Sequence, residues 1–308
     1  MAQHPLGRTG LTVTRIGFGS APVGYLKTER DEAGRLLNAL LDRGVNLIDT
    51  AASYPGSEEL IGEYVGHRRG EFVLVSKCGS KVPHVDLPDA PAWSAKLIDA
   101  TVDASLRRCR TDALDVMLLH SCDLKTLQAG EALGALVRAR DAGKIKFVGY
   151  SGDNEALAYA AAQPDIAVVE TSINLVDQVN LDQGLPVCRQ HDVGVLVKRP
   201  IANAAWKDLA DQRGIYQSYA KTYSDRLRQM NLTPATVGLP ADAWGELALR
   251  FTLSFPDVHC AIIGTTNPAN LDLNLRVLDK GPLPADAVAK LRQAFRDAPG
   301  SAKWTGQT

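Results

Sequence analysis

Short apolar runs alternate with longer segments of helical periodicity along most of the chain. In residues 29–42 the apolar side chains recur at helical spacing, and Gly44 follows as a stop signal. The next apolar run, residues 45–48, is too short for a helix and predicts a buried strand. The same reasoning predicts eight strands in all, over residues 13–18, 45–48, 72–76, 114–119, 145–150, 166–170, 194–197 and 260–263.

The segments between these strands have the length and periodicity of helices. We predict helices over residues 29–42, 58–65, 95–108, 124–142, 155–162, 184–191, 243–254 and 268–278. Alternating strands and helices form a parallel sheet, and eight such units in 308 residues are typical of a closed (β/α)8 barrel, the TIM barrel. Residues 5–13 predict a β-hairpin ahead of the barrel, with Gly7 and Gly10 as turn residues. No flexible linker divides the chain, so we expect residues 1–308 to form a single domain.

An open, doubly wound sheet is the alternative arrangement of these elements. Such a sheet normally carries a glycine-rich phosphate-binding turn after its first strand. The segment Gly17-Phe18-Gly19-Ser20-Ala21-Pro22 begins like that turn but has Pro22 where the third glycine belongs. The closed barrel is therefore the favoured prediction.

Two predicted connections are too long to be simple links. Residues 78–93 follow the third strand and residues 198–242 follow the seventh. Long loops after barrel strands lie on the face where barrel enzymes carry their active sites. The second loop contains four aromatic residues that either line a pocket or anchor the loop to the barrel: Trp206, Tyr216, Tyr219 and Tyr223.

Composition and charge narrow the classes of partner. The 34 basic and 35 acidic residues give a net charge of -1, so neither nucleic acid nor an acidic membrane is an expected partner. The five cysteines lack metal-binding or disulfide spacing, which favours reduced thiols and no metal site. No signal-peptide core follows Met1, and no run approaches the ~20 apolar residues of a membrane helix. We therefore expect a cytoplasmic location.

Polar residues of complementary chemistry stand where successive predicted strands end. Asp49, Lys77 and His120 each close an apolar strand, and Tyr54 follows Asp49 by five residues. Any one of them alone could simply meet solvent. In a closed barrel, however, all of these strand ends open into the same mouth.

These residue types together can move a proton to or from an oxygen atom. A free tyrosine titrates near pKa ~10, and a neighbouring ammonium lowers that value by stabilising the phenolate. Lys77 can supply the ammonium, and Asp49 can hold it in place and keep it protonated. His120 can hydrogen-bond the same substrate oxygen as Tyr54.

At this point the residues match a known family. The chain resembles the aldo-keto reductases over nearly its full length, through residues 46–51 with Tyr54 and Gly56, residues 75–77 and residues 115–120. The family's catalytic Asp, Tyr, Lys and His fall on Asp49, Tyr54, Lys77 and His120. The resemblance implies hydride transfer between a nicotinamide cofactor and a carbonyl or alcohol, without a Rossmann domain.

The resemblance also implies a set of residues around the nicotinamide. Ser151 is the expected carboxamide contact, and Gly152 stands where the family has Asn. Glu170 replaces the usual Gln but can still accept a hydrogen bond from the carboxamide NH₂. The family's stacking aromatic falls at Lys198, which leaves Arg199 or a loop aromatic to pack on the ring.

The adenine end of the cofactor is implied to lie on residues 263–274. The matching positions are Gly264, Thr265, Thr266, Asn267, Asn270 and Asn274. The family default is NADP(H), whose 2′-phosphate is normally held by Lys or Arg. Because these positions are neutral, NAD(H) or dual use is also plausible, and Asn267→Arg is predicted to favour NADPH.

Three functions from different classes remain open. The first is an NAD(P)-dependent oxidoreductase acting on an aldehyde, ketone or sugar hemiacetal, with similarity to the bacterial and plant aldose or L-galactose dehydrogenase branch. The second is a cofactor-binding regulatory subunit with little turnover. The third is a barrel enzyme that forms a Schiff base on Lys77. A monomer or a small homo-oligomer is expected.

Overall fold

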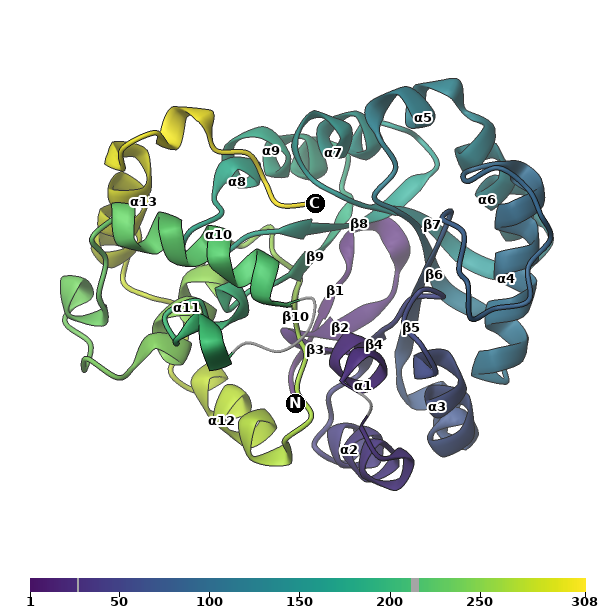
Figure 1. The fold of residues 1–308 in the computed structure, drawn as a ribbon, viewed down its shortest axis with the longest axis horizontal. Coiled ribbons are helices and arrows are strands. Elements are labelled where there is room, and N and C mark those ends of the chain that lie inside the picture. The colour runs from purple at the N-terminus through teal and green to yellow at the C-terminus, as the bar shows by residue number, and fades with distance from the viewer. Residues whose placement is uncertain (27, 212–215) are drawn as a thin grey trace.

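A closed barrel of eight parallel strands forms the centre of the molecule (Figure 1). The structure is a computed structural model that describes residues 1–26, 28–211 and 216–308, with only the backbone described at residues 211 and 216. Neighbouring strands follow the order β10-β3-β4-β5-β6-β7-β8-β9, so β10 pairs with β3 and closes the ring. The predicted barrel is confirmed. Its strands are β3 (Ile16–Gly19), β4 (Leu47–Asp49), β5 (Val73–Cys78), β6 (Leu114–His120), β7 (Ile145–Ser151), β8 (Ile166–Ser172), β9 (Gly194–Lys198) and β10 (Cys260–Ile263).

Helices surround the barrel on its outer side (Figure 1). They are α1 (Ala21–Tyr25), α2 (Arg30–Asp42), α3 (Ser57–Tyr64), α4 (Ala95–Cys109), α5 (Leu124–Ala129), α6 (Glu131–Asp141), α7 (Asn154–Ala161), α8 (Val179–Gln183), α9 (Leu185–Gln190), α10 (Tyr216–Gln229), α11 (Trp244–Leu253), α12 (Pro268–Leu278) and α13 (Ala285–Asp297). In the described part of the chain, no helix combines the length and the apolar character needed to cross a membrane.

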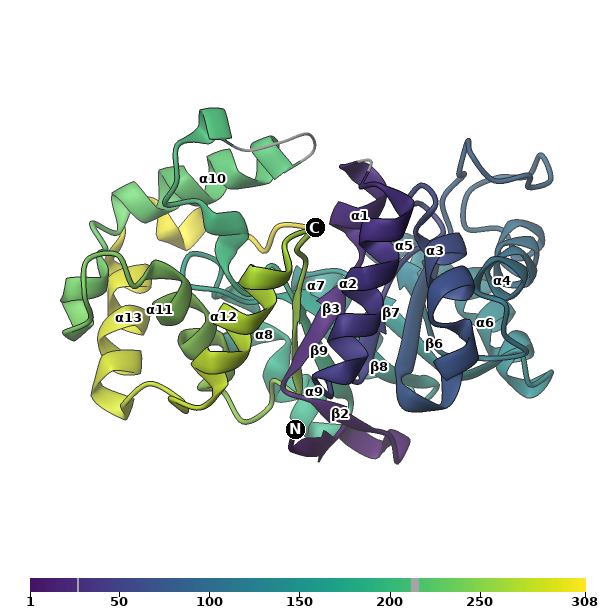
Figure 2. The same ribbon diagram turned by 90° about the horizontal axis from the view of Figure 1, so that it is seen from below.

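The predicted hairpin is present and covers one end of the barrel. Strands β1 (Gln3–Pro5) and β2 (Thr12–Thr14) pair antiparallel, with Gly10 at φ 72° in the turn between them. Leu6 is fully buried and packs with Val13 against the inner residues of the barrel. Figure 2 shows the hairpin at one end and α1, α10 and the C-terminus at the other. The open end therefore belongs to the carboxyl ends of the strands.

Two apolar layers explain why the strands read as nearly continuous hydrophobic runs. Inward-facing residues such as Leu47, Val75 and Leu196 fill the barrel, whereas outward-facing residues such as Ile48 and Leu74 pack against the helices. Parallel strands are buried on both faces, so neither face keeps a polar alternation. Polar side chains are therefore displaced toward the strand ends.

The structure divides two predicted elements and adds others. The strand predicted over residues 13–18 is two strands, β2 and β3, that belong to different sheets. The helix predicted over 124–142 is broken into α5 and α6 at Gly130, whose φ of 77° does not continue a helix. The helix predicted over 184–191 is present as α9. Helices α1, α8, α10 and α13 were not predicted.

In its described residues, the loop predicted over residues 198–242 contains α10 and three short 3-10 helices. Its aromatic residues serve both predicted purposes. The Trp206 ring stacks on Trp244 with 5.7 Å between centroids, and Tyr223 is fully buried, so these two anchor the segment. Tyr219 lines the cleft described below. The Tyr216 side chain lies outside the described residues.

Candidate active site

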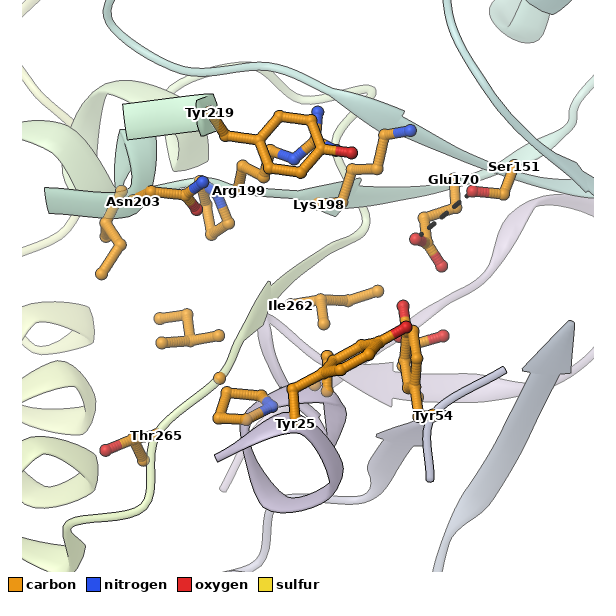
Figure 3. A pocket seen from close by; sticks show the side chains of 18 of the residues that line it. Tyr25, Tyr54, Ser151, Glu170, Lys198, Arg199, Asn203, Tyr219, Ile262 and Thr265 are labelled. Atoms are coloured by element: carbon orange, nitrogen blue, oxygen red, sulfur yellow. Dashed lines mark hydrogen bonds between the residues drawn. The ribbon is translucent and has the colours of Figure 1, made fainter. Parts of the chain in front are cut away.

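A cleft of about 560 Å³ opens at the carboxyl ends of the barrel strands. Asp49, Tyr54 and His120 line its inner end, where the long loop after β5 contributes no residue to the wall. Figure 3 shows Tyr25 and Tyr54 on one side of the cleft and Ser151 and Glu170 on the other. The cleft therefore brings the predicted catalytic group and part of the predicted cofactor group into one space.

Lys77 lies beneath this inner end, is fully buried and contacts several groups through its ammonium. Its Nζ donates to Asp49 Oδ1 and, at 2.9 Å, to the carbonyl of Thr50. Glu170 Oε2 lies 3.2 Å from the same nitrogen, an ion pair without hydrogen-bond geometry. The pair expected from the sequence, Asp49 with Lys77, is thus a cluster of two carboxyl groups around one ammonium. The sequence signal for Glu170 was its place near the end of a strand.

Burial and charge shift the protonation of the cluster. Burial, and then the charge of Glu170, raise the pKa of Asp49 well above its ordinary value despite the opposing effect of Lys77. Burial alone would lower the pKa of Lys77, but Asp49, Glu170 and Tyr54 raise it above its ordinary value. Lys77 therefore stays protonated at neutral pH and is a poor amine nucleophile, which disfavours the Schiff-base function.

His120 closes the inner end as a neutral imidazole. Burial and then the positive charges of Lys77, Lys198 and Arg199 lower its pKa well below the ordinary value. Its Nδ1 lies 3.5 Å from Ser53 Oγ, at the limit of a hydrogen bond. A neutral ring can either donate or accept a hydrogen bond through its other nitrogen.

Tyr54 lies between the ammonium and the imidazole. Lys77 Nζ is 5.4 Å from the centroid of the Tyr54 ring, and the ring centroids of Tyr54 and His120 are 6.1 Å apart. Tyr25 from α1 packs edge-on against Tyr54 at 5.6 Å. Tyr54 lies in the turn between β4 and α3, two residues ahead of Gly56, whose φ is 72°. All four predicted catalytic residues therefore converge.

The nicotinamide residues expected from the sequence occupy the opposite wall. Ser151 and Glu170 are buried, with Ser151 Oγ 3.5 Å from Glu170 Oε1. Lys198 pairs with Asp153 at 3.0 Å, and the Arg199 guanidinium lies 3.8 Å from the Tyr219 ring centroid. Tyr219 is an aromatic residue of the long loop on this wall, and Lys198 stands where the resemblance implies a stacking aromatic.

Gly152 is an expected cofactor residue at a position where the surrounding structure leaves no room for a side chain. It does not line the cleft. A Cβ atom there would lie 2.2 Å from the hydroxyl oxygen of Tyr150. That hydroxyl is fixed by donating to the Cys122 carbonyl at 2.9 Å. No side chain fits at this position without moving Tyr150.

The far end of the cleft reaches the loop between β10 and α12. Gly264, Thr265, Thr266 and Asn270 line it, whereas Asn267 and Asn274 do not. Asn267 instead caps α12, because its Oδ1 accepts from the amide of Ala269 at 2.9 Å. The cleft thus runs from a buried hydroxyl–carboxylate pair to a helix N-terminus, which suits a ligand with an amide at one end and phosphates toward the other.

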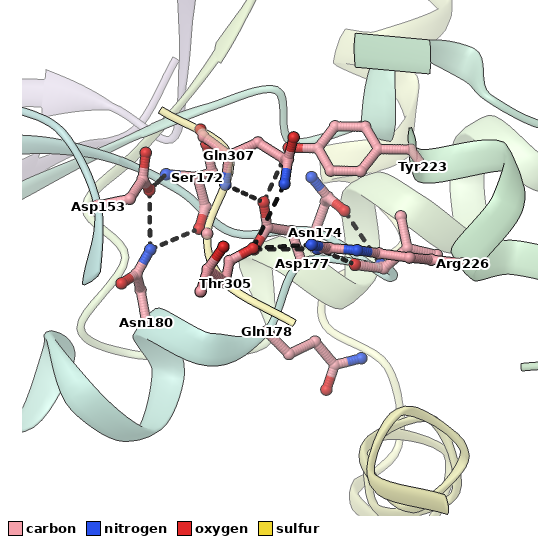
Figure 4. A network of polar contacts seen from close by, with 12 residues as sticks. Asp153, Ser172, Asn174, Asp177, Gln178, Asn180, Tyr223, Arg226, Thr305 and Gln307 are labelled. Carbon is pink, nitrogen blue, oxygen red and sulfur yellow. Dashed lines mark hydrogen bonds and ion pairs between the residues drawn. The ribbon is translucent and has the colours of Figure 1, made fainter. Parts of the chain in front are cut away.

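A polar network holds the C-terminal segment beside this cleft (Figure 4). The backbone amide of Gln307 donates to Asp177 Oδ2 at 3.0 Å, and its carbonyl accepts from Ser172 at 2.9 Å and from Arg199. Arg226 donates to the carbonyl of Thr305 at 2.8 Å. The segment is therefore tied to β8, to α10 and to the cleft wall.

Asp177 makes this network sensitive to pH. Burial, and then repulsion from Asp153, raise its pKa from 3.8 to about 7. The folded protein therefore holds a proton that the unfolded chain releases, so stability falls as pH rises from about 4 to about 7. Over this pH range the wild type should lose a few kcal/mol of unfolding free energy relative to Asp177→Asn, whose side chain stays neutral. Each tenfold change in proton affinity is worth ~1.4 kcal/mol. Urea unfolding of both proteins at about pH 5 and about pH 8 measures this. Parallel pH dependences in the two proteins would contradict it.

Comparison with known proteins agrees with this architecture. The model of the Aldo/keto reductase family matches residues 15–296. The L-galactose dehydrogenase of Arabidopsis thaliana is 26% identical over 64% of this chain and 64% of its own length. A probable voltage-gated potassium channel subunit beta from Arabidopsis thaliana is 26% identical over 97% of this chain and 98% of its own.

A solved structure supports the same fold. The holo form of aldo-keto reductase AKR11C1 from Bacillus halodurans superposes with a TM-score of 0.80 at 24% identity, over 96% of each chain. The family match covers nearly the whole barrel, including the four converging residues at its mouth. The chain therefore belongs to the aldo/keto reductase family.

Proposed function

We propose that the protein is an NAD(P)-dependent oxidoreductase of carbonyl compounds, acting as one domain over residues 1–308. The observation that carries this proposal is the convergence of Tyr54, Lys77, Asp49 and His120 at the inner end of the cleft. The substrate is a small aldehyde, ketone or sugar hemiacetal, since these residues can exchange a proton with a carbonyl or hydroxyl oxygen.

Tyr54 is the proton donor in reduction and the proton acceptor in oxidation. The bound nicotinamide supplies or accepts the hydride. The Lys77 ammonium stabilises the phenolate form of Tyr54, and its hydrogen bonds to Asp49 and to the Thr50 carbonyl fix its position. Neutral His120 donates a hydrogen bond to the same substrate oxygen and orients it.

The opposite wall and the far end of the cleft would hold the cofactor. Ser151 and Glu170 would face the carboxamide, and the α12 N-terminus would face the phosphates. The expected cofactor residues that line the cleft are Ser151, Glu170, Lys198, Arg199, Gly264, Thr265, Thr266 and Asn270. Gly152, Asn267 and Asn274 were also expected to bind the cofactor but lie outside the lining. The neutral residues at the far end are compatible with either NAD(H) or NADP(H).

The choice between NADPH and NADH can be tested at the far end. Asn270→Arg should lower the NADPH dissociation constant relative to NADH by roughly tenfold or more, because a charge-assisted bond to the 2′-phosphate is worth ~1.5–3 kcal/mol. Asn267→Arg should change affinity in the same direction, but it removes the α12 cap at a cost of ~1 kcal/mol of stability. Fluorescence titration of both reduced cofactors measures the ratio.

The control for these variants is Leu273→Arg. Leu273 lies on the same helix, is 54% exposed and does not line the cleft. Leu273→Arg adds the same charge without facing the ligand, so its ratio of NADPH to NADH dissociation constants should match that of the wild type. An unchanged ratio in both asparagine variants would remove the adenine-end assignment.

Within this function we favour sugars as the substrate class, which is the specificity of the aldose dehydrogenase subclass. The relative named L-galactose dehydrogenase supports it. A cofactor-coupled screen of aldehydes, ketones and sugars, run with NADH, NAD⁺, NADPH and NADP⁺, tests it directly. Sugar-dependent reduction of NAD(P)⁺ is the expected result, and turnover restricted to simple ketones would contradict the subclass.

A regulatory subunit with little turnover is the second candidate. The observation that favours it is the similarity to a probable potassium channel subunit beta along nearly the whole chain. This candidate predicts cofactor binding without steady-state turnover anywhere on the substrate panel. Turnover with any substrate at ordinary enzyme rates, ~1 s⁻¹ or faster, would reject it.

A further inference from the structure

Glu170 places a carboxylate at the expected carboxamide site, where the resemblance implies a neutral glutamine. It comes from β8, across the barrel from β4 and β5, and its side chain is almost fully buried. One carboxylate oxygen lies 3.5 Å from the hydroxyl of Ser151, and the other lies 3.2 Å from Lys77 Nζ. The carboxylate therefore bridges the expected carboxamide site and the catalytic ammonium.

The charges around Glu170 do not balance. Two carboxyl groups, Asp49 and Glu170, share the single ammonium of Lys77. Among the described residues, neither neighbouring cation forms an ion pair with these acids, because Lys198 pairs with Asp153 and Arg199 donates to two neutral groups, the Ser172 hydroxyl and the Gln307 carbonyl. His120 is neutral. With both acids ionised, the buried cluster carries one net negative charge.

Buried charge of this kind is unfavourable unless a proton or a cation compensates it. Burial and the charge of Glu170 together raise the pKa of Asp49, which reflects this imbalance. A cationic ligand at the inner end of the cleft would compensate it without a proton. The oxidised nicotinamide ring is such a cation, whereas the reduced ring is neutral.

We propose that Glu170 is a specificity-determining residue that makes this cleft prefer the oxidised over the reduced nicotinamide cofactor. This inference rests on the proposed function, since it requires the nicotinamide to bind beside Ser151. A glutamine at the same place could still hydrogen-bond the carboxamide but would add no charge. The preference follows from the charge of Glu170, and it favours loading of the cleft with the oxidised cofactor, the form that oxidation of an alcohol or hemiacetal consumes.

The test compares dissociation constants rather than turnover. Binding of NADH and NADPH is measured by fluorescence titration, and binding of NAD⁺ and NADP⁺ by calorimetry, for the wild type and Glu170→Gln. The variant should bind the oxidised form about tenfold or more weakly relative to the reduced form, as expected for one charge at short range in a partly screened site. Loss of the carboxamide contact alone would weaken both forms equally, so the ratio isolates the charge.

The matched control is Asp123→Asn. Asp123 is an exposed cap of α5 outside the cleft, and asparagine caps a helix equally well. This variant removes one negative charge and should leave the ratio of the dissociation constants for the oxidised and reduced cofactors unchanged. An unchanged ratio in Glu170→Gln overturns the proposal and leaves the proposed function intact.

The wild type provides a second measurement that does not depend on the variant folding. It should bind the oxidised cofactor at least as tightly as the reduced one. Tighter binding of the reduced form overturns the inference alone. Absence of binding for all four cofactors overturns both the inference and the proposed oxidoreductase function.

Discussion

Replacement of Tyr54 by phenylalanine is expected to slow the chemical step by roughly 10²-fold or more, the usual contribution of a positioned general acid. Phenylalanine keeps the ring that packs between Tyr25 and His120, so the fold should not change. The loss should appear in single-turnover hydride transfer. Cofactor affinity should stay near the wild-type value, because the hydroxyl acts on the substrate oxygen.

The matched control for this experiment is Tyr25→Phe. Tyr25 lies against Tyr54 in the same cleft, but its hydroxyl donates to the Ser53 carbonyl at 3.2 Å. Removal of that hydroxyl should alter the chemical step far less than removal of the Tyr54 hydroxyl. A Tyr54→Phe variant with near-normal single-turnover rates would refute the assigned role.

Replacement of Lys77 by methionine is expected to reduce the free energy of unfolding by about 3–5 kcal/mol near neutral pH. The substitution removes the ammonium from between two buried carboxyl groups, Asp49 and Glu170, and leaves their charge unpaired. The penalty should shrink as pH falls, because the acids can then take up protons. Urea unfolding at several pH values measures the effect, and activity should be lost as well.

Two further variants separate charge imbalance from simple loss of packing. The double variant Lys77→Met/Asp49→Asn removes one of the unpaired acids and should recover part of the stability. Lys221→Met breaks an ion pair with Asp225 in which the lysine side chain is 69% exposed, so it should change stability by less than about 1 kcal/mol. Equal destabilisation in the single and double variants would show that unpaired charge is not the cause.

The catalytic arrangement could be predicted from the sequence because it follows from strand order. Asp49 and Lys77 end β4 and β5, which are neighbours in the barrel, so a closed sheet brings their side chains together. Glu170 belongs to β8, which is separated from β5 by two strands in the ring. Its contact with Lys77 crosses the barrel interior, and no local pattern indicates which side chains meet there.

The elements that were missed have different physical causes. Helix α1 has five residues, too few for a periodic pattern. Helix α13 does carry Ala287, Leu291 and Phe295 as buried residues at helical spacing, so its signal was present in the sequence. The break between α5 and α6 was missed because the apolar spacing continues across it. The break itself follows from the backbone conformation of Gly130, which ends α5.

The ties on the C-terminal segment have a kinetic consequence. Arg199 and Arg226 donate to backbone carbonyls of that segment, and Lys198 is neutralised by Asp153. Hydrogen bonds to neutral carbonyls fix the position of an arginine but do not cancel its charge. Arg199, which lines the cleft, therefore keeps a positive charge there, and the association rate of a dinucleotide with two phosphates should fall as ionic strength rises.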